Sequence, residues 1–281
     1  MDFTGDNNGT AGGFSGAAAS VALSPENGEN AAGSYRQVGT DNVLSYSVFG
    51  NGNQFGFEQI GDANSVTGIV GGDDNDVAIS ITGDLNSAQS VQVGTSDSFG
   101  LTITGDLNAV DSFQGGSDND LTVSIDGDEN EVNSTQFGAD DIARLTLNGD
   151  NNLLSTYQDG SRNTMNVSIN GDGNNANGFS PAFTGFAADV RDIARAELPA
   201  GVSGFRRGSL VQSGSNNDLL ISVQNSNNNS FATLQNGNDN SITGTISGIG
   251  GNQATIAQLS NSNTVVFTQN GSGNNLGVVQ Q

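Results

Sequence analysis

Histidine, cysteine, lysine and tryptophan are all absent from this chain of 281 residues. Without histidine and cysteine, the usual zinc, haem, iron–sulfur and thiol sites are excluded, and so are Ser-His-Asp and Cys-His catalysis. Without lysine, the chain can form neither a Schiff base nor the phosphate-binding lysine of a P-loop. Because most common catalytic groups are missing, we expect a protein that is not an enzyme.

Positive charge is also scarce, since seven arginines face 30 acidic residues and the net charge is −23. Such a chain repels the phosphates of nucleic acids, so no nucleic-acid partner is expected. No run of about eighteen apolar residues occurs, so no helix is expected to span a membrane. The first residues lack the basic and apolar start of a signal peptide, which predicts either a protein that is not exported or a numbering that starts at a processed end.

Glycine, in contrast, is abundant and periodic. It recurs every eleven residues from Gly39 to Gly171 without a gap, and Asn or Asp follows each of these glycines three positions later. Gly, Asn and Asp tolerate the positive φ angles of tight turns. We therefore expect turns at Gly83, Gly94, Gly105, Gly116, Gly127, Gly138, Gly149 and Gly160.

The residue two places before each glycine alternates between aliphatic and glutamine, so the structural unit has 22 residues. From residue 81 the series is Ile81, Gln92, Ile103, Gln114, Ile125, Gln136, Leu147, Gln158 and Ile169. Gln37 and Gln59 follow the opposite phase, and the glutamines change sides where Val70 and Ile81 follow one another. Within each arc the side chains alternate with period two, which is typical of strands. Two strands and two turns per repeat predict an all-β fold, a β-solenoid of about eleven two-stranded coils.

Stacking of equivalent residues explains how a chain with only 33% hydrophobic residues can fold. A buried amide destabilises the fold unless it is hydrogen-bonded. On coils about 4.8 Å apart, each side-chain amide can bond to its equivalent on the next coil. The expected ladder residues are Gln92, Gln114, Gln136 and Gln158, together with Asn86, Asn108, Asn130 and Asn152.

The repeat stops after Asn174 and resumes at Gln212. We expect a solenoid over residues 1–174, an insertion over 175–209 and a continuation of the solenoid over 210–281. Within the insertion, helical spacing of Phe186, Val190, Ile193, Ala194 and Leu198 between two prolines predicts one short amphipathic helix. The glycine phase also extends toward the N-terminus, which predicts further arcs at Gly5, Gly16 and Gly28.

The motif Gln-x-Gly-x-x-Asn on a 22-residue unit resembles the curlin repeat of bacterial curli fibres. It is matched by Gln37–Asn42, Gln59–Asn64, Gln114–Asn119, Gln158–Asn163, Gln212–Asn217 and Gln235–Asn240. The curlin unit usually carries a second glutamine on its other strand, where this chain has Ile, Val or Leu. The resemblance implies a secreted functional amyloid, a subunit that polymerises into an extracellular fibre of the biofilm matrix and mediates adhesion.

The ends of the solenoid predict the same partner, a second copy of the chain joined head to tail. No capping segment is evident in the repeat pattern, and an uncapped end-to-end contact that does not close makes a filament. Outward apolar residues such as Phe113, Phe137 and Tyr157 could add lateral contacts between fibres. The alternative is a discrete surface solenoid: an adhesin, or an ice-binding protein using the outward column of Ser80, Thr102, Ser124, Thr146 and Ser168.

Aspartates follow every second repeat glycine, at positions 62 to 172 in steps of 22. Stacked carboxylates repel one another, and a divalent cation such as Ca²⁺ would relieve the repulsion. Two interpretations remain open: a calcium site formed by this column, or carboxylates that point into solvent and keep the protein soluble. The residues of the calcium interpretation are Asp84, Asp106, Asp128 and Asp150.

Overall fold

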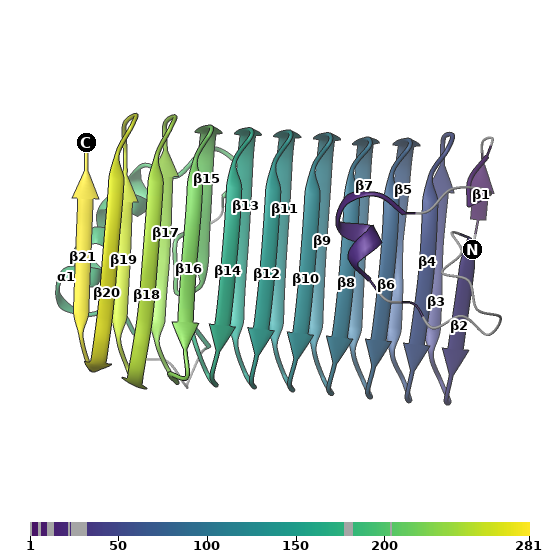
Figure 1. The fold of residues 1–281 in the computed structure, drawn as a ribbon, viewed down its shortest axis with the longest axis horizontal. Coiled ribbons are helices and arrows are strands. Elements are labelled where there is room, and N and C mark those ends of the chain that lie inside the picture. The colour runs from purple at the N-terminus through teal and green to yellow at the C-terminus, as the bar shows by residue number, and fades with distance from the viewer. Residues whose placement is uncertain are drawn as a thin grey trace. The chain divides into compact units, whose positions relative to one another are not determined.

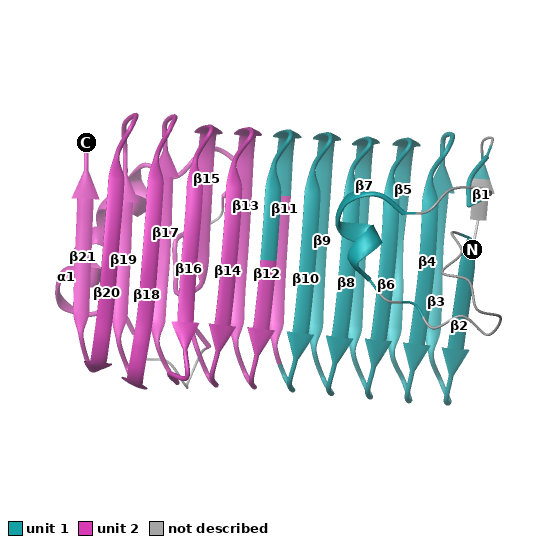
Figure 2. Cartoon of the chain, viewed as in Figure 1, with its two compact units in different colours: residues 1–129, 136–144 teal, residues 130–135, 145–281 magenta. Residues whose placement is uncertain are grey.

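The structure, a computed structural model, describes residues 2–4, 7–9, 14–21, 23, 33–176, 182–202 and 204–281. It confirms the expected fold class: about 60% of the chain is strand and 7% helix, in a β-solenoid of about eleven turns with one helix. The chain divides into two compact units (Figure 2). Unit 1 holds residues 1–129 and 136–144, and unit 2 holds residues 130–135 and 145–281.

In unit 1 successive strands alternate between two parallel sheets (Figure 1), one of odd-numbered and one of even-numbered strands. Residues 22 apart are partners, as Gln92 and Gln114 are between β7 and β9. The strands are β1 (Asp2–Thr4), β2 (Ser34–Val38), β3 (Val43–Phe49), β4 (Gln54–Ile60), β5 (Ser65–Asp73), β6 (Asp76–Thr82), β7 (Ser87–Thr95), β8 (Ser98–Thr104), β9 (Ala109–Ser117) and β10 (Asp120–Asp126). Strands β11 (Glu131–Ala139) and β12 (Ile142–Asn148) each contribute residues to both units.

Unit 2 repeats this arrangement, and its coils continue in register across the insertion. Gln158 of β13 is the partner of Gln212 of β15, although 54 residues separate them in sequence. Beyond residue 212 most partners are 23 apart, as Gln212 and Gln235 are. The strands are β13 (Leu153–Ser161), β14 (Thr164–Asn170), β15 (Ser209–Ser215), β16 (Asp218–Gln224), β17 (Ser230–Asn236), β18 (Ser241–Gly250), β19 (Gln253–Gln258), β20 (Thr264–Ser272) and β21 (Asn275–Gln280).

The core lies between the two sheets of each unit. Because side chains alternate along a strand, every second residue points inward. On β8 these are Phe99, Leu101 and Ile103, all almost completely buried. Full burial of one such side chain stabilises a fold by roughly 1.5–3 kcal/mol. The facing strands supply smaller and polar residues, such as Val110 and Gln114 on β9, which are equally buried.

The segment around Gly16 does not continue the coil, although the sequence predicts an arc there. Gly16 instead begins a short 3₁₀ helix, η1 (Gly16–Ser20), which packs against β6, β8 and β10. Room for η1 comes from Gly100, because a Cβ atom there would collide with the carbonyl oxygen of Ala17. The expected arcs at Gly5 and Gly28 lie outside the described residues.

The predicted helix is present as α1 (Gly185–Ala196), and it packs on β19 and β21. Its predicted apolar face is partly wrong: Phe186 is 71% exposed and Ile193 is 42% exposed, while Ala187 is fully buried beside Val190 and Ala194. The helix approaches a flat sheet so closely that small side chains form the contact. A Cβ atom at Gly277 of β21 would collide with the backbone of Phe186.

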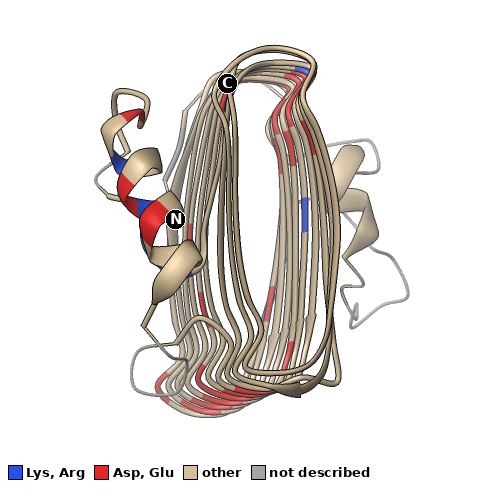
Figure 3. Ribbon diagram, turned by 90° about the vertical axis from the view of Figure 1, so that its left-hand side faces the viewer, with Lys and Arg blue, Asp and Glu red and all other residues tan. Residues whose placement is uncertain are grey.

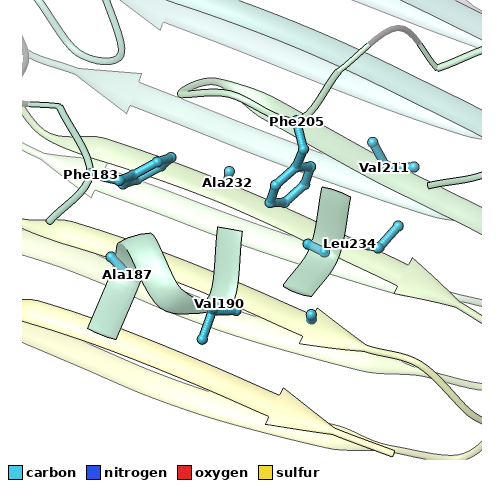
Figure 4. Close-up of a cluster of buried hydrophobic side chains, with 9 residues drawn as sticks. Phe183, Ala187, Val190, Phe205, Val211, Ala232 and Leu234 are labelled. Atoms are coloured by element: carbon cyan, nitrogen blue, oxygen red, sulfur yellow. The ribbon is translucent and has the colours of Figure 1, made fainter. Parts of the chain in front are cut away.

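Behind α1, a cluster of buried apolar side chains joins the insertion to the sheet (Figure 4). Phe183 and Phe205 come from the two ends of the insertion, and Leu234 comes from β17. The cluster fixes the insertion to unit 2 by burying apolar surface on one side of the sheet only. Within the described residues, no helix is long and apolar enough to cross a membrane.

Candidate functional site: the stacked amide columns

Buried glutamines in unit 1 form the expected ladder. Gln92 Nε2 donates to Gln114 Oε1 at 2.9 Å, and Gln114 Nε2 donates to Gln136 Oε1 at 3.0 Å. The same Nε2 atoms also donate to backbone carbonyls of the facing sheet, as Gln114 does to Ser98 at 3.0 Å. Each amide thus links neighbouring coils and also ties the two sheets together, which satisfies polar groups that burial would otherwise penalise.

An equivalent ladder is present in unit 2. Gln158 donates to Gln212, Gln212 to Gln235, Gln235 to Gln258 and Gln258 to Gln280, with Nε2–Oε1 distances of 2.9–3.1 Å. In every bond the earlier residue donates and the later residue accepts. The ladder therefore has a direction, and its two ends are chemically different.

The change of side near residue 70 is visible as a break in hydrogen bonding. Gln37 donates to Gln59 at 2.6 Å in the sheet of β2 and β4, but the next partner of Gln59 is Ile81. In the other sheet Val70 is the partner of Gln92. Because Val70 has no donor, Gln92 Oε1 is buried and has no hydrogen-bond partner in the described structure.

Asparagine columns at the turns are satisfied more completely than the glutamines. Asn86 Oδ1 accepts both the backbone N–H and the Nδ2 of Asn108, at 2.9 and 3.1 Å. Asn108 Nδ2 also donates to the carbonyl of Gly127 at 2.8 Å. Asn130 and Asn152 are linked in the same way in unit 2. The side chains thereby replace the backbone partners that the turns lack.

Asp97 interrupts one of these columns. Its Oδ1 accepts the backbone N–H and the Nδ2 of Asn119, at 3.0 and 2.9 Å. Its Oδ2 is buried without a hydrogen-bond partner among the described residues. In Asn75, one coil earlier, the equivalent Nδ2 donates to the carbonyl of Gly94 at 3.1 Å. Burial, and to a smaller extent the charge of Asp118, raises the pKa of Asp97.

The eight predicted turn glycines stack in columns, but for a partly different reason than expected. Seven of them have φ between 126° and 141°, whereas Gly94 is not in the positive range. The turns are close-packed at these positions, since a Cβ at Gly83 or Gly94 would collide with the glycine carbonyl one coil on. The other left-handed position lies two residues after the glycine. It is Asp or Asn in several coils but is occupied by Leu85, Leu107 and Glu129 in others, where sequence preference did not reveal it.

The aspartate column caps backbone groups. Asp106 Oδ1 accepts the backbone N–H of Asp84 at 2.7 Å, and Asp128 Oδ1 accepts that of Asp106 at 2.7 Å. The same contact exists between Asp150 and Asp172, at 3.0 Å. A backbone N–H from Thr40 and then its hydroxyl lower the pKa of Asp62. Figure 3 shows acidic residues gathered at the turns.

No group of three or more acidic side chains in the described structure is arranged to hold a metal ion. In Asp84, Asp106 and Asp128 one carboxylate oxygen already accepts a backbone N–H. Asn227 replaces aspartate at the equivalent turn and accepts the backbone N–H of Asp172 at 2.9 Å, so an amide performs the same role. The calcium interpretation therefore gains no support.

Outward residues of the glutamine strands include a close aromatic pair. The rings of Phe113 and Phe137 lie 4.8 Å apart. Tyr157 was expected to be available for contacts on the same face. Its hydroxyl donates to the carbonyl of Ala200 in the insertion at 3.2 Å. On the aliphatic strands, Ser80 is nearly buried, so the outward Ser/Thr column is not uniformly open to solvent.

Sequence reasoning missed the column that holds η1. Asp76 Oδ2 accepts the backbone N–H of Ser15 at 2.6 Å, Ser98 Oγ accepts that of Ala18 at 2.9 Å, and Asp120 Oδ1 accepts that of Ala17. Desolvation raises the pKa of Asp76. The available signal was the run of small residues at Gly56, Ala78 and Gly100, where later coils carry larger side chains.

No protein-family model matches this chain, and no curated protein is significantly similar to it. The fold itself is consistent with a structural or adhesin-like repeat protein. The stacked amides link residues that are partners in parallel strands, as Gln92 and Gln114 are.

Proposed function

We propose that the protein is a structural, non-enzymatic subunit that assembles with copies of itself into an extracellular, curli-like fibre for adhesion and matrix formation. The observation that supports this most directly is the unpaired edge of the last coil. Within the described chain β21 pairs only with β19, and β20 pairs only with β18. Such edges present rows of unpaired N–H and C=O groups to another chain.

Parallel stacking in register supports the amyloid-like character of the fibre. In each unit identical amides stack on successive strands, as they do in cross-β assemblies. A fibre built by adding coils would preserve that spacing. Its diffraction would show a reflection near 4.8 Å along the fibre axis.

Electron microscopy and fibre diffraction of the purified chain test the proposal. We expect unbranched filaments with the strand spacing along the axis. A monomer that remains stable at high concentration would overturn the fibre and favour a discrete adhesin.

A matched pair of variants locates the contact. Gln280→Lys places a charge on the open edge and should abolish filaments while the monomer stays folded. Leu220→Lys, on an exposed position of β16, should leave the filaments intact. Filaments of Gln280→Lys that match those of the unmodified chain would show that the edge of β21 is not the contact.

A further inference from the structure

The shared direction of the glutamine ladders leaves complementary groups on the first and last glutamine rungs of the chain. Gln280, the last rung of the glutamine ladder in unit 2, donates its Nε2 to the carbonyl of Thr264 at 3.2 Å, and no further glutamine accepts from it in the described chain. Gln37, the first rung of the short ladder in the sheet of β2 and β4, donates to Gln59, but its Oε1 accepts no hydrogen bond from any described residue. One end therefore lacks an acceptor, and the other end lacks a donor.

The asparagine columns show the same complementarity. Asn274 donates both its N–H and its Nδ2 to Asn252 Oδ1, at 3.1 and 2.8 Å, while its own Oδ1 accepts nothing from the described residues. Near the start of the chain Asn8 Oδ1 accepts the backbone N–H of Asn53 at 3.0 Å. The backbone N–H of Asn8 has no partner in the described structure, whereas interior rungs such as Asn75 and Asn86 donate their N–H to the preceding asparagine.

The path of the coil dictates which strands a second copy can add. Because successive strands alternate between the two sheets, the strand that follows β21 lies against β20, and the next one lies against β21. A second copy that continues this path places its β1 on β20 and its β2 on β21. Its Asn8 then follows Asn274, since these residues lie at the turns between the paired strands.

Register completes the match. Gln37 lies two residues before the turn glycine Gly39, and Gln280 is the partner of Gln258 at the equivalent position. We propose that a second copy docks with β2 on β21, so that Gln280 Nε2 donates to the incoming Gln37 Oε1 and Asn274 Oδ1 accepts from the incoming Asn8 N–H. This joint rests on the proposed fibre and specifies its contact surface.

Burial favours the same joint. In this register Tyr35, which is 64% exposed, lies on Val278 of β21, which is partly exposed. One coil further in, the equivalent residues Phe57 and Ile256 are almost completely buried. Docking therefore covers apolar surface at both ends while it completes the ladders.

The joint also accounts for the change of side near residue 70. Gln37 and Gln59 are out of phase with the later glutamines of their own chain. Placed on β21, they instead extend the ladder of the preceding copy by two rungs. The change of side near residue 70 then separates two ladders. The ladder of the preceding copy ends at Gln59, and the chain's own ladder begins at Gln92.

Engineered disulfides test the register, because the chain contains no cysteine. In the proposed joint Val38 faces Gln281 of the neighbour, at the strand separation of about 4.8 Å, which lies within the range of roughly 4.4–6.8 Å that a disulfide spans between Cα atoms. If β2 instead docked on β20 and displaced β1, Gln37 would meet Gln269 and Val38 would face Asn270. The variants are Val38→Cys/Gln281→Cys and, as the matched control, Val38→Cys/Asn270→Cys.

We expect mild oxidation of filaments of the first variant to give a series of covalent multimers on non-reducing gels. The control should remain monomeric, and Val38→Cys alone should give dimers at most. Filaments in which only the control forms multimers, or in which neither double variant does, would overturn the joint and leave the fibre standing. A chain that forms no filaments and remains monomeric would overturn the fibre, and the joint with it.

Discussion

Val70 lies in register with Gln92, and as a result Gln92 Oε1 is buried without a hydrogen bond in the described structure. A directional ladder inevitably leaves one acceptor unpaired at its first rung. The consequences of substituting a glutamine should therefore depend on its position along the ladder.

Gln114→Leu should destabilise the fold more than Gln92→Leu. In Gln114→Leu, Gln92 Nε2 loses the oxygen to which it donates. Gln136 Oε1 loses the hydrogen bond that it accepts from Gln114. In Gln92→Leu, Gln114 Oε1 loses its donor, but the unpaired Oε1 of Gln92 is removed at the same time. The number of unpaired buried acceptors therefore does not rise. The expected difference in the free energy of unfolding is about 1–3 kcal/mol, the penalty for one buried polar group left unpaired. Urea unfolding of both variants measures it, and equal losses would contradict the directional ladder.

Asp97→Asn should stabilise the protein at neutral pH. An amide at this position can donate where Oδ2 is unpaired, as Asn75 does, and the expected gain is about 1–3 kcal/mol. The pKa of Asp97 is raised in the folded state, so the folded protein binds the proton more tightly than the unfolded chain does. Stability of the unmodified chain relative to the variant therefore rises as the pH falls through that raised pKa.

The advantage of Asp97→Asn should accordingly shrink on acidification and stop changing below the ordinary aspartate pKa of 3.8. Melting curves of both proteins between pH 3 and pH 7 are the measurement. Asp111→Asn, at an exposed position of β9, serves as the control and should show no such pH-dependent gain. A gain that is independent of pH would argue against ionisation of Asp97 as its cause.

Gly100→Val should release η1 without disrupting the sheet. The backbone of Gly100 is not in the positive φ region, and valine favours strands, but its Cβ would collide with the carbonyl of Ala17. Hydrogen exchange at the amides of Ala17 and Ala18, which donate to Asp120 and Ser98, should become much faster. Asn166→Val, at the equivalent position of β14, should leave their protection unchanged. Unaltered exchange in Gly100→Val would show that close approach does not hold η1.

Asp106→Asn should raise the melting temperature at low salt. The amide oxygen can still accept the N–H of Asp84, and one charge of the aspartate column is removed. Because salt screens exposed charges, the gain should disappear at an ionic strength of about 1 M. Asp106→Ala removes the acceptor as well and should lower the melting temperature at both ionic strengths. Melting scans with added Ca²⁺ against an ionic-strength control would expose any cation effect on the unmodified chain.

Sequence alone determined the repeat, the two-stranded coil and the ladders, because stacking forces residues 22 apart into identical surroundings. The glutamine column, its change of side at Val70 and the asparagine column could all be derived from that periodicity. Equivalent positions on successive coils have the same surroundings, so they carry similar residues at a regular spacing in the sequence.

Only the tertiary structure decided where the chain departs from the regular coil. Whether Gly16 continues a coil or starts η1, and whether Phe186 or Ala187 of α1 meets the sheet, depend on steric fit against Gly100 and Gly277. Leu85 adopts positive φ because the stacked turns impose it, against its own preference. Such outcomes follow from close packing between segments far apart in sequence, and periodicity carries no record of them.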